Sequence, residues 1–524
     1  MWKFWRNPEF VRHKRAELRP ARALMVAVVV VFIAALIGLA CWSERQEMLE
    51  TAQRNAQRLG GQWVPYAEKV RRENPRETWL LLCRWLVGLQ AGLVPFWSMF
   101  MCAQAVSGER DRRTWDFQRT TSLTAAEITL GKVLGEPILG YFAALCVLPI
   151  TIWAGVAGGI SFWSLLAGYV GLFAGALFLG LSGLWLSTML ESRSRGVGLI
   201  GALFVFCLMM GTYAFAASWF PGLAGFSPVA GLHSILGIKL VEAREVTPML
   251  FGHEVPWVLV SLLLYASFGA WITIMILRNL KRDYSELRPL SRWQVVGCVA
   301  FLNFMFYALF SRNGEVVKSD ELASFMVAVN GAILFLVGLG SLTPLERLKV
   351  WWRERAEGTA NMFSENGLPW PWLLLSGVVA YAFMVWDILA WRMALDFHSR
   401  SLRTAALELL VVLIFITRDI LFIQWCTLTR LRQPVLKGVL FLCLYYATAG
   451  VVIAISSISG EAAAISAMNL LTPFGIFDPR SEWGHSAIST YGGMALQVGL
   501  IAMILVAISN RLGRPSLVPA VSEG

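Results

Sequence analysis

The sequence has few charged residues and lacks the common motifs that bind nucleotide phosphates or build a catalytic centre. Only 15% of its 524 residues are charged, whereas soluble domains have about 25%. It contains no G-x-x-x-x-G-K-[ST] motif, because Gly131-Lys132 is followed by Val133 and no earlier glycine precedes it at the required spacing. HExxH and GxSxG are also missing. We therefore expect no catalytic residues in this chain and no nucleotide bound in the P-loop manner.

The few cysteines and histidines follow no disulfide or metal-binding pattern. The eight cysteines include no CxxC pair and fall inside or at the edges of apolar segments, where they are expected to be small core residues. His13 precedes the first apolar segment, and His233, His253, His398 and His485 lie between later ones. Their spacing matches no standard metal site. The sequence therefore predicts ordinary loop histidines and no metal centre.

What the sequence has in abundance is hydrophobic residues, 57% of the total, arranged in long runs. A soluble domain has about 45–50% apolar residues in short periodic groups, so this chain is expected to be a polytopic membrane protein. Its net charge of +11 is explained by Lys and Arg in loops that stay in the cytosol. We therefore expect the lipid bilayer as a partner and no nucleic acid.

Twelve segments are apolar over about the 20 residues that a bilayer-spanning helix needs. They are 24–42, 79–106, 133–157, 162–190, 196–220, 256–278, 294–311, 322–342, 371–391, 403–427, 437–458 and 492–510. An even number of spans places both termini on one side. Lys and Arg are concentrated at the N-terminus and in alternate loops, while the charges of residues 43–78 nearly cancel. The positive-inside rule then predicts cytosolic N- and C-termini, with residues 43–78 outside.

Short motifs that recur in the same order indicate two halves. SLTAAE at 122–127 recurs as SLTPLE at 341–346, and FSPVAGL at 226–232 is echoed by LTPFGIF at 471–477. The predicted fold class is thus an all-α polytopic membrane protein with about twelve transmembrane helices in two six-helix pseudo-repeats. Its expected parts are an interfacial helix in 1–23, a first half in 24–278, a cytosolic linker in 279–293, a second and more divergent half in 294–510, and a cytosolic tail in 511–524.

Three ionisable residues fall inside expected spans: Asp387, Arg418 and Asp419. A charge at the centre of a bilayer costs about 2.5–3.5 kcal/mol on insertion scales, so each needs an explanation. They either line a polar path or gate between helices, or Arg418 pairs with a carboxylate of another helix and fixes the packing. In the fourth span Gly171 and Gly175 form a GxxxG motif, which predicts close helix packing.

The most polar segment between two spans is GERDRRTWDFQRTTSLTAAEITLGK, residues 108–132, with nine charged residues. It lies on the predicted cytosolic side, between the second and third spans. Thr124 is expected to cap a short helix, because Glu127 three residues later completes a capping box. Gly131 and Lys132 then lead into the third span.

This layout resembles the transmembrane permease subunit of an ATP-binding-cassette exporter of the type-2 (ABC-2) class. The family has Glu, basic residues, Thr, an apolar pair and a polar turn, followed by Gly-Lys at the start of the next helix. The matching residues are Glu109, Arg110, Thr114, Phe117, Ser122, Leu123, Thr124, Glu127, Gly131 and Lys132. Residues 1–23 are similar to the interfacial elbow helix of the family, and FSPVAGL is similar to its outer Ser/Asn-Pro element. Ser122 stands where the family usually has Pro.

The resemblance implies a permease in which residues 108–132 form a coupling helix seated on a separate cytosolic ABC ATPase, present in two copies. That partner would bind ATP and Mg, so this chain would hold no cofactor and hydrolyse nothing itself. The implied cargo is a hydrophobic or amphipathic small molecule, lipid or peptide, exported across the inner membrane of a bacterial cell. The resemblance is thin over residues 281–510. The alternative is an ion-coupled secondary transporter that uses Asp387, Arg418 and Asp419.

Overall fold

The computed structural model describes most of the chain. The described residues are 7–59, 63–189, 203, 205–207, 224–232, 248–251, 253–282, 290–310, 319–395, 402–429, 434–459, 471–472 and 487–513, with side chains over slightly shorter ranges. They form two compact units. Unit 1 comprises Met1–Pro289 with Ala308–Asn313, and unit 2 comprises Leu290–Tyr307 with Gly314–Gly524.

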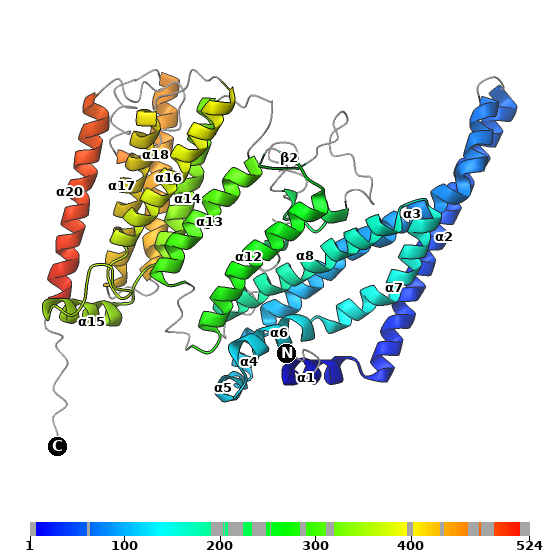
Figure 1. The fold of residues 1–524 in the computed structure, drawn as a ribbon, viewed down its shortest axis with the longest axis horizontal. Coiled ribbons are helices and arrows are strands. Elements are labelled where there is room, and N and C mark those ends of the chain that lie inside the picture. The colour runs from blue at the N-terminus through cyan, green and yellow to red at the C-terminus, as the bar shows by residue number, and fades with distance from the viewer. Residues whose placement is uncertain are drawn as a thin grey trace. The chain divides into compact units, whose positions relative to one another are not determined.

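Helices account for nearly all regular structure in both units (Figure 1). Unit 1 contains α1 (Pro8–Glu17), α2 (Pro20–Leu59), α3 (Trp63–Gln104), α4 (Ser107–Asp111), α5 (Trp115–Thr120), α6 (Ala125–Gly135), α7 (Ile138–Ala157), α8 (Phe162–Met189), the 3-10 turn Ala230–Leu232, and α12 (Trp257–Asn279). Two short antiparallel strands, β1 (Met249–Leu250) and β2 (His253–Glu254), precede α12. Unit 2 contains α14 (Ser319–Gly340), α15 (Leu345–Ala356), α16 (Trp370–Leu395), α17 (Leu402–Thr427), α18 (Pro434–Ser459) and α20 (Ala487–Leu512), and most of α13 (Arg292–Phe310).

The predicted fold class, an all-α polytopic membrane protein, is confirmed. Within the described ranges, eight helices are long and apolar enough to cross a membrane, or nine if the bent pair α14 and α15 counts as one. Two shorter apolar helices, Trp370–Trp386 and Lys437–Val452, coincide with further expected spans. The fifth expected span, 196–220, lies almost wholly outside the described residues. The count of twelve, the division into six-helix halves and the side on which the termini lie therefore stay predictions.

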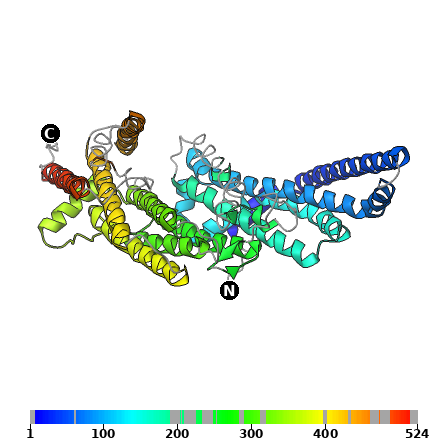
Figure 2. The ribbon, with the colours of Figure 1, turned by 90° about the horizontal axis from the view of Figure 1, so that it is seen from above.

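The segment 43–78, expected as a loop, is mostly helical. α2 continues to Leu59 and α3 begins at Trp63, so the two helices form a long hairpin, visible in both Figure 1 and Figure 2. The polar parts of these helices carry exposed ion pairs between residues one helical turn apart, such as Arg54–Glu50 at 2.7 Å. The near-cancelling charges of this segment thus include intrahelical pairs.

The third span also begins later than expected. Residues 125–135 form the separate helix α6, and α7 starts at Ile138 after Pro137. Proline has no backbone N–H to donate to a carbonyl of the preceding turn, so the helix is interrupted there. Lys132 therefore belongs to a helix that precedes the span and can form ion pairs.

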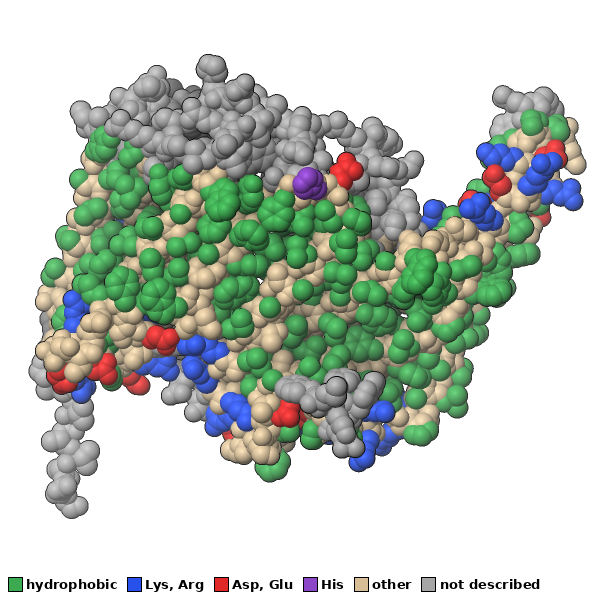
Figure 3. All heavy atoms as spheres, in the orientation of Figure 1, with side chains coloured by type: hydrophobic (Ala, Val, Ile, Leu, Met, Phe, Trp, Pro, Cys, Tyr) green, Lys and Arg blue, Asp and Glu red, His purple; other side chains and the backbone are tan. Residues whose placement is uncertain are grey.

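On the face drawn in Figure 3, apolar side chains cover much of the surface of the long helices. Only 11% of the most apolar 18-residue stretch of α2 is buried. Large exposed residues there include Leu24, Phe32 and Leu39, each more than 60% exposed. A helix apolar on all sides but in contact with protein on one side only is expected to face lipid with the remainder.

Glycines bring α8 close to its neighbours, at the predicted GxxxG motif and also nearer the end of the helix. Gly171 and Gly175 are buried, and a Cβ on Gly175 would lie 3.3 Å from the ring of Tyr265 in α12. At Gly183 a Cβ would lie only 2.4 Å from the backbone oxygen of Met99 in α3. Backbone cannot move aside as a side-chain end can, so the α3–α8 contact depends most on Gly183.

We expect Gly183→Ala to lower the thermal stability of the purified protein. The added methyl must push α8 away from α3, and overpacking of this kind costs about 1–3 kcal/mol. Gly92→Ala in α3 is the matched control, because nothing lies within 4 Å of its added Cβ; it should be neutral or slightly stabilising. Thermal unfolding in detergent measures both. A Gly183→Ala protein as stable as the control would show that the helices tolerate wider spacing.

Candidate functional site

The segment between α3 and α7 folds into three successive helices, α4, α5 and α6. Arg113, between α4 and α5, has a φ of 57° and turns the chain sharply. The predicted capping box is confirmed: the backbone N–H of Glu127 donates to Oγ1 of Thr124 (3.2 Å), and that of Thr124 donates to Oε2 of Glu127 (2.8 Å). These hydrogen bonds with Thr124 lower the pKa of Glu127. The local sequence alone fixes the start of α6.

Lys132 is fully buried at the centre of this segment. Its Nζ lies 2.7 Å from Oε2 of Glu109 in α4 and 3.4 Å from Oε1 of Glu9 in α1. It also donates to the backbone oxygen of Ala105 (3.3 Å). A buried ammonium is tolerated only when its charge and its donors are matched. The three acceptors come from different parts of the chain, so Lys132 ties α6 to α1 and to the end of α3.

Helix α1 packs directly on α6, and Figure 1 shows α1, α4, α5 and α6 at one end of unit 1. Asn7 caps α1 and donates from Nδ2 to the backbone oxygen of Glu127 (2.7 Å). Arg12 bridges the two acidic groups, at 2.6 Å from Glu9 and 2.9 Å from Glu109. The contact requires a small residue at Gly131, where a Cβ would lie 2.6 Å from Cβ of Glu9.

The electrostatics of the cluster keep Glu9 ionised. Burial alone raises the pKa of Glu9, but the hydrogen bond with His13 and the charges of Lys132 and Arg12 outweigh burial and lower the pKa to about 2. Burial dominates at Glu136, also near His13, and raises its pKa. Because the folded pKa of Glu9 is depressed, its stabilisation is complete above about pH 4.5 and is lost as the pH falls towards 2.

The residues predicted from the sequence divide into two sets. Glu109, Gly131 and Lys132 point inward and belong to the buried cluster. Arg110 is half-buried and donates to the backbone oxygen of Thr188 (3.1 Å). The exposed set comprises Thr114, Phe117, Ser122 and Thr124, with Leu123 and Glu127 at its half-buried edge.

Glu109 is therefore not an exposed contact residue. Its side chain is 13% exposed and both of its carboxylate oxygens are engaged within the chain. By contrast, Phe117 is 77% exposed although it stands on α5, whose first residue Trp115 is only 4% exposed. Trp115 packs among Ile128 and Leu184, so α5 is anchored on one side and presents a large aromatic ring on the other.

Sequence reasoning missed the α1 half of the cluster. Asn7, Glu9, Arg12 and His13 were included only in a general interfacial helix. A signal was present, because Gly131 and Gly135 are four residues apart and therefore share one face of α6. A flat face of this kind indicates a closely packed partner, but the sequence could not tell which element fills it.

Unit 2 has a different segment after its second helix. α14 ends at Gly340 and, after a four-residue turn, α15 continues at an angle of 86°. Gln424 of α17 holds this turn, because it accepts from the backbone N–H of Thr343 (2.9 Å) and donates to its backbone oxygen (2.8 Å). Arg292 donates to Oγ1 of Thr343 (3.0 Å). No counterpart of α4 and α5 lies between α14 and α15.

Arg418 and Asp419 pair with each other, whereas one of the two alternatives from the sequence paired Arg418 with a carboxylate of another helix. Nη2 of Arg418 lies 2.6 Å from Oδ1 of Asp419, and both side chains are less than 10% exposed. Further bonds run to α18 and α20: Tyr446 donates to Asp419 (2.5 Å), and Arg418 donates to Gln497 (2.7 Å). The Arg418–Asp419 pair therefore joins three helices. Asp387 lies in α16, and its side chain lies outside the described residues.

The amino-acid sequence was also compared with known protein families. Residues 6–230 match the family described as ABC-2 type transporter. Comparison with curated proteins and with solved structures gave no match. The matched part of the chain, which includes α1 and the whole α4–α6 segment, is similar to the ABC-2 type transporter family. The resemblance inferred from the sequence is confirmed over this range, and the protein is a multi-pass membrane component of a transporter.

Proposed function

We propose that this chain is the permease subunit of an ABC exporter of the type-2 class, driven by a separate cytosolic ATPase in two copies. The cargo would be a hydrophobic or amphipathic small molecule, lipid or peptide, moved across the inner membrane of a bacterial cell. ATP and Mg would be bound by the partner. Both termini and the α4–α6 segment would face the cytosol.

The observation that carries the proposal is the contrast between the two sides of the α4–α6 segment. One side is fixed by the buried Lys132, while Phe117 on the other side is 77% exposed. A large aromatic side chain on a rigid support is typical of an anchor in a protein interface. Its neighbours Arg112 and Arg113 are also exposed, so a partner with an apolar groove and an acidic rim would fit.

The buried cluster suggests how movement would pass from the partner to the membrane helices. A push on α5 would reach α6 through the packing of Trp115 against Ile128. Lys132 would carry it to α1 through Glu9 and to α4 through Glu109. Because these contacts are ion pairs and close packing, the segment would move as a unit and shift the ends of α2 and α3. Closure of the ATPase on ATP would thus select a second arrangement of the permease.

The test is Phe117→Asp, with Val350→Asp in α15 as the matched control. Val350 is 46% exposed on the inner segment of unit 2, so both variants place a carboxylate on an exposed helix. Loss of a central anchor costs on the order of 2 kcal/mol or more, a factor of about 30 in affinity. We expect wild type and Val350→Asp to co-purify with a P-loop ATPase and Phe117→Asp to lose it while still inserting in the membrane.

Two results would contradict the proposal. One is a Phe117→Asp protein that retains normal ATPase binding and substrate-stimulated hydrolysis. The other is transport by purified wild-type protein driven by an ion gradient with no ATPase present, which would instead favour the secondary-transporter alternative.

A further inference from the structure

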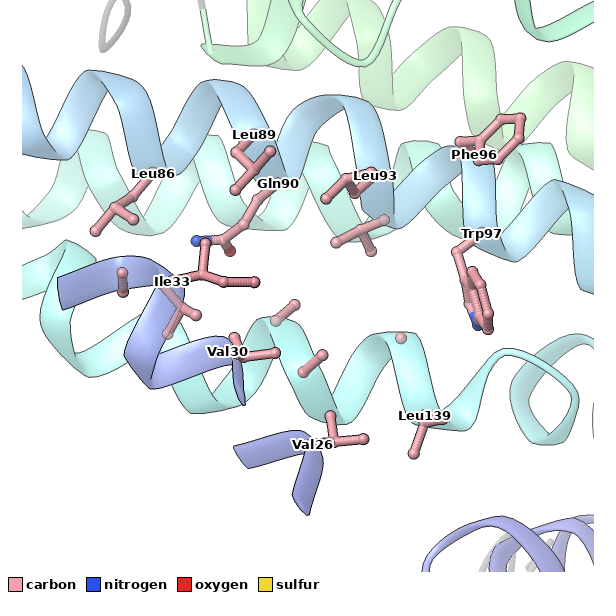
Figure 4. A pocket seen from close by; sticks show the side chains of 16 residues that line it. Val26, Val30, Ile33, Leu86, Leu89, Gln90, Leu93, Phe96, Trp97 and Leu139 are labelled. Atoms are coloured by element: carbon pink, nitrogen blue, oxygen red, sulfur yellow. The ribbon is translucent and has the colours of Figure 1, made fainter. Parts of the chain in front are cut away.

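Unit 1 contains an apolar cavity of about 480 Å³ between α2, α3 and α7 (Figure 4). Its size falls within the range of about 300–1,000 Å³ that is typical of small-molecule sites. Val30 of α2, Leu93 of α3 and Val147 of α7 are among the aliphatic residues of its wall, and Phe96 and Trp97 contribute aromatic rings. Among the described residues, no charged side chain lines it.

One polar group interrupts this wall. Gln90 of α3 is 6% exposed, and Figure 4 shows its amide reaching from α3 towards Ile33 of α2. Nε2 donates to Oγ1 of Thr151 (3.3 Å), but among the described residues Oε1 has no hydrogen-bond partner. A buried acceptor left unpaired is strongly disfavoured, and more so where lipid replaces water. A donor that approaches Oε1 from the cavity would satisfy this acceptor.

We propose that this cavity binds a single-chain, uncharged lipid-like molecule from the bilayer, whose hydroxyl or amide N–H donates to Oε1 of Gln90. The absence of charged side chains from the wall excludes a charged headgroup, because burial of an unpaired charge in an apolar site is far too costly. The apolar, exposed face of α2 offers a route from the hydrocarbon region. This site is independent of the proposed ATPase contact, which lies on α5.

The hydroxyl of Tyr169 is the competing donor within the protein. It interacts with Thr151 and Gln90, although no hydrogen bond of good geometry joins it to either. If Tyr169 satisfied Gln90 the cavity would need no polar ligand. A useful experiment must therefore separate Tyr169 from an external donor.

The experiment uses the full chain in phosphatidylcholine nanodiscs with two photoreactive probes: hexadecanol carrying a diazirine in its chain, and its O-methyl ether. The ether keeps the shape and the oxygen but has no donor. We expect labelling of cavity residues such as Leu93 and Val147, identified by mass spectrometry, with about five-fold more labelling by the alcohol, as one hydrogen bond provides. In Gln90→Leu the two probes should label equally.

Ala143→Phe fills the cavity while leaving Gln90 in place, and should abolish labelling there. Leu145→Phe on the same helix is the matched control, because Leu145 is 52% exposed and does not line the cavity. Tyr169→Phe should retain the preference for the alcohol. Equal labelling of wild type by both probes, unchanged labelling of Ala143→Phe, or loss of the preference in Tyr169→Phe would each overturn the proposal.

Discussion

Lys132→Met is expected to lower the thermal stability of the protein more than any other single change in the α4–α6 segment. The substitution removes the buried one of the two cations that Glu9 and Glu109 share and leaves Arg12, whose side chain is 49% exposed. Breaking a buried ion pair by removing one partner costs about 3–5 kcal/mol. The melting temperature in detergent should fall by on the order of 10 °C. α1 should also detach from α6, which a cysteine pair placed across this contact would detect by lost cross-linking.

Two controls separate this effect from a general loss of positive charge. Arg119→Met removes an ion pair with Asp116 that is 3.7 Å long and exposed on the Asp116 side, and such pairs contribute about 0–1 kcal/mol. Glu109→Gln combined with Lys132→Met should recover part of the lost stability, because it neutralises one of the two carboxylates that have lost Lys132. If Lys132→Met melts within a few degrees of Arg119→Met, the buried cluster does not hold the segment together.

The second large effect is expected at Arg418 in unit 2. Arg418→Leu strips Asp419 of its counter-ion at a position where Asp419 is only 3% exposed, so we again expect a loss of about 3–5 kcal/mol. The double variant Arg418→Leu with Asp419→Leu should be much more stable than the single variant, since buried ion pairs replaced by apolar residues are often neutral. Thermal melting of the three proteins measures the difference.

The same pair of variants distinguishes a structural from a transport role. Each of the three nitrogens of Arg418 donates to Asp419, Gln497, Tyr446 or the backbone oxygen of Leu471. Because its donors are occupied in this way, we expect Arg418 to hold α17, α18 and α20 together. The stable double variant should then retain transport. Complete loss of transport in a stable double variant would instead place the pair in a substrate or ion path.

Local sequence was sufficient for features governed by nearby residues. The capping box of Thr124 and Glu127 depends on a spacing of three residues, and its geometry follows once the helix starts there. The apolar segments were found for the same reason, because a span needs only its own residues to satisfy its backbone. Boundaries were less accurate: the hairpin of α2 and α3 extends through 43–78, where charge hid the helical pattern.

The partners of the polar residues could not be predicted from local sequence. Lys132 appeared in the sequence as the last residue of a motif, yet its acceptors lie 23 and 123 positions away in Glu109 and Glu9. The sequence predicted both Phe117 and Glu109 as contacts with the ATPase. In the structure Phe117 is exposed, whereas Glu109 forms ion pairs within the chain. For Arg418 the sequence left two alternatives open, and only the structure shows that it pairs with Asp419 and bonds to Tyr446 and Gln497 on other helices.

The sequence by itself determined that this protein is a helical membrane protein with a polar, ABC-2-like segment after its second span. Hydrophobic length and cap spacing are properties of contiguous residues, so no knowledge of the packing was needed. Only the tertiary structure decided which face of that segment is buried against α1, that Gly183 lies against the backbone of α3, and that Gln90 faces an apolar cavity. Each of these depends on which distant helix supplies the neighbouring atoms, and burial energies and hydrogen bonds are set by those neighbours.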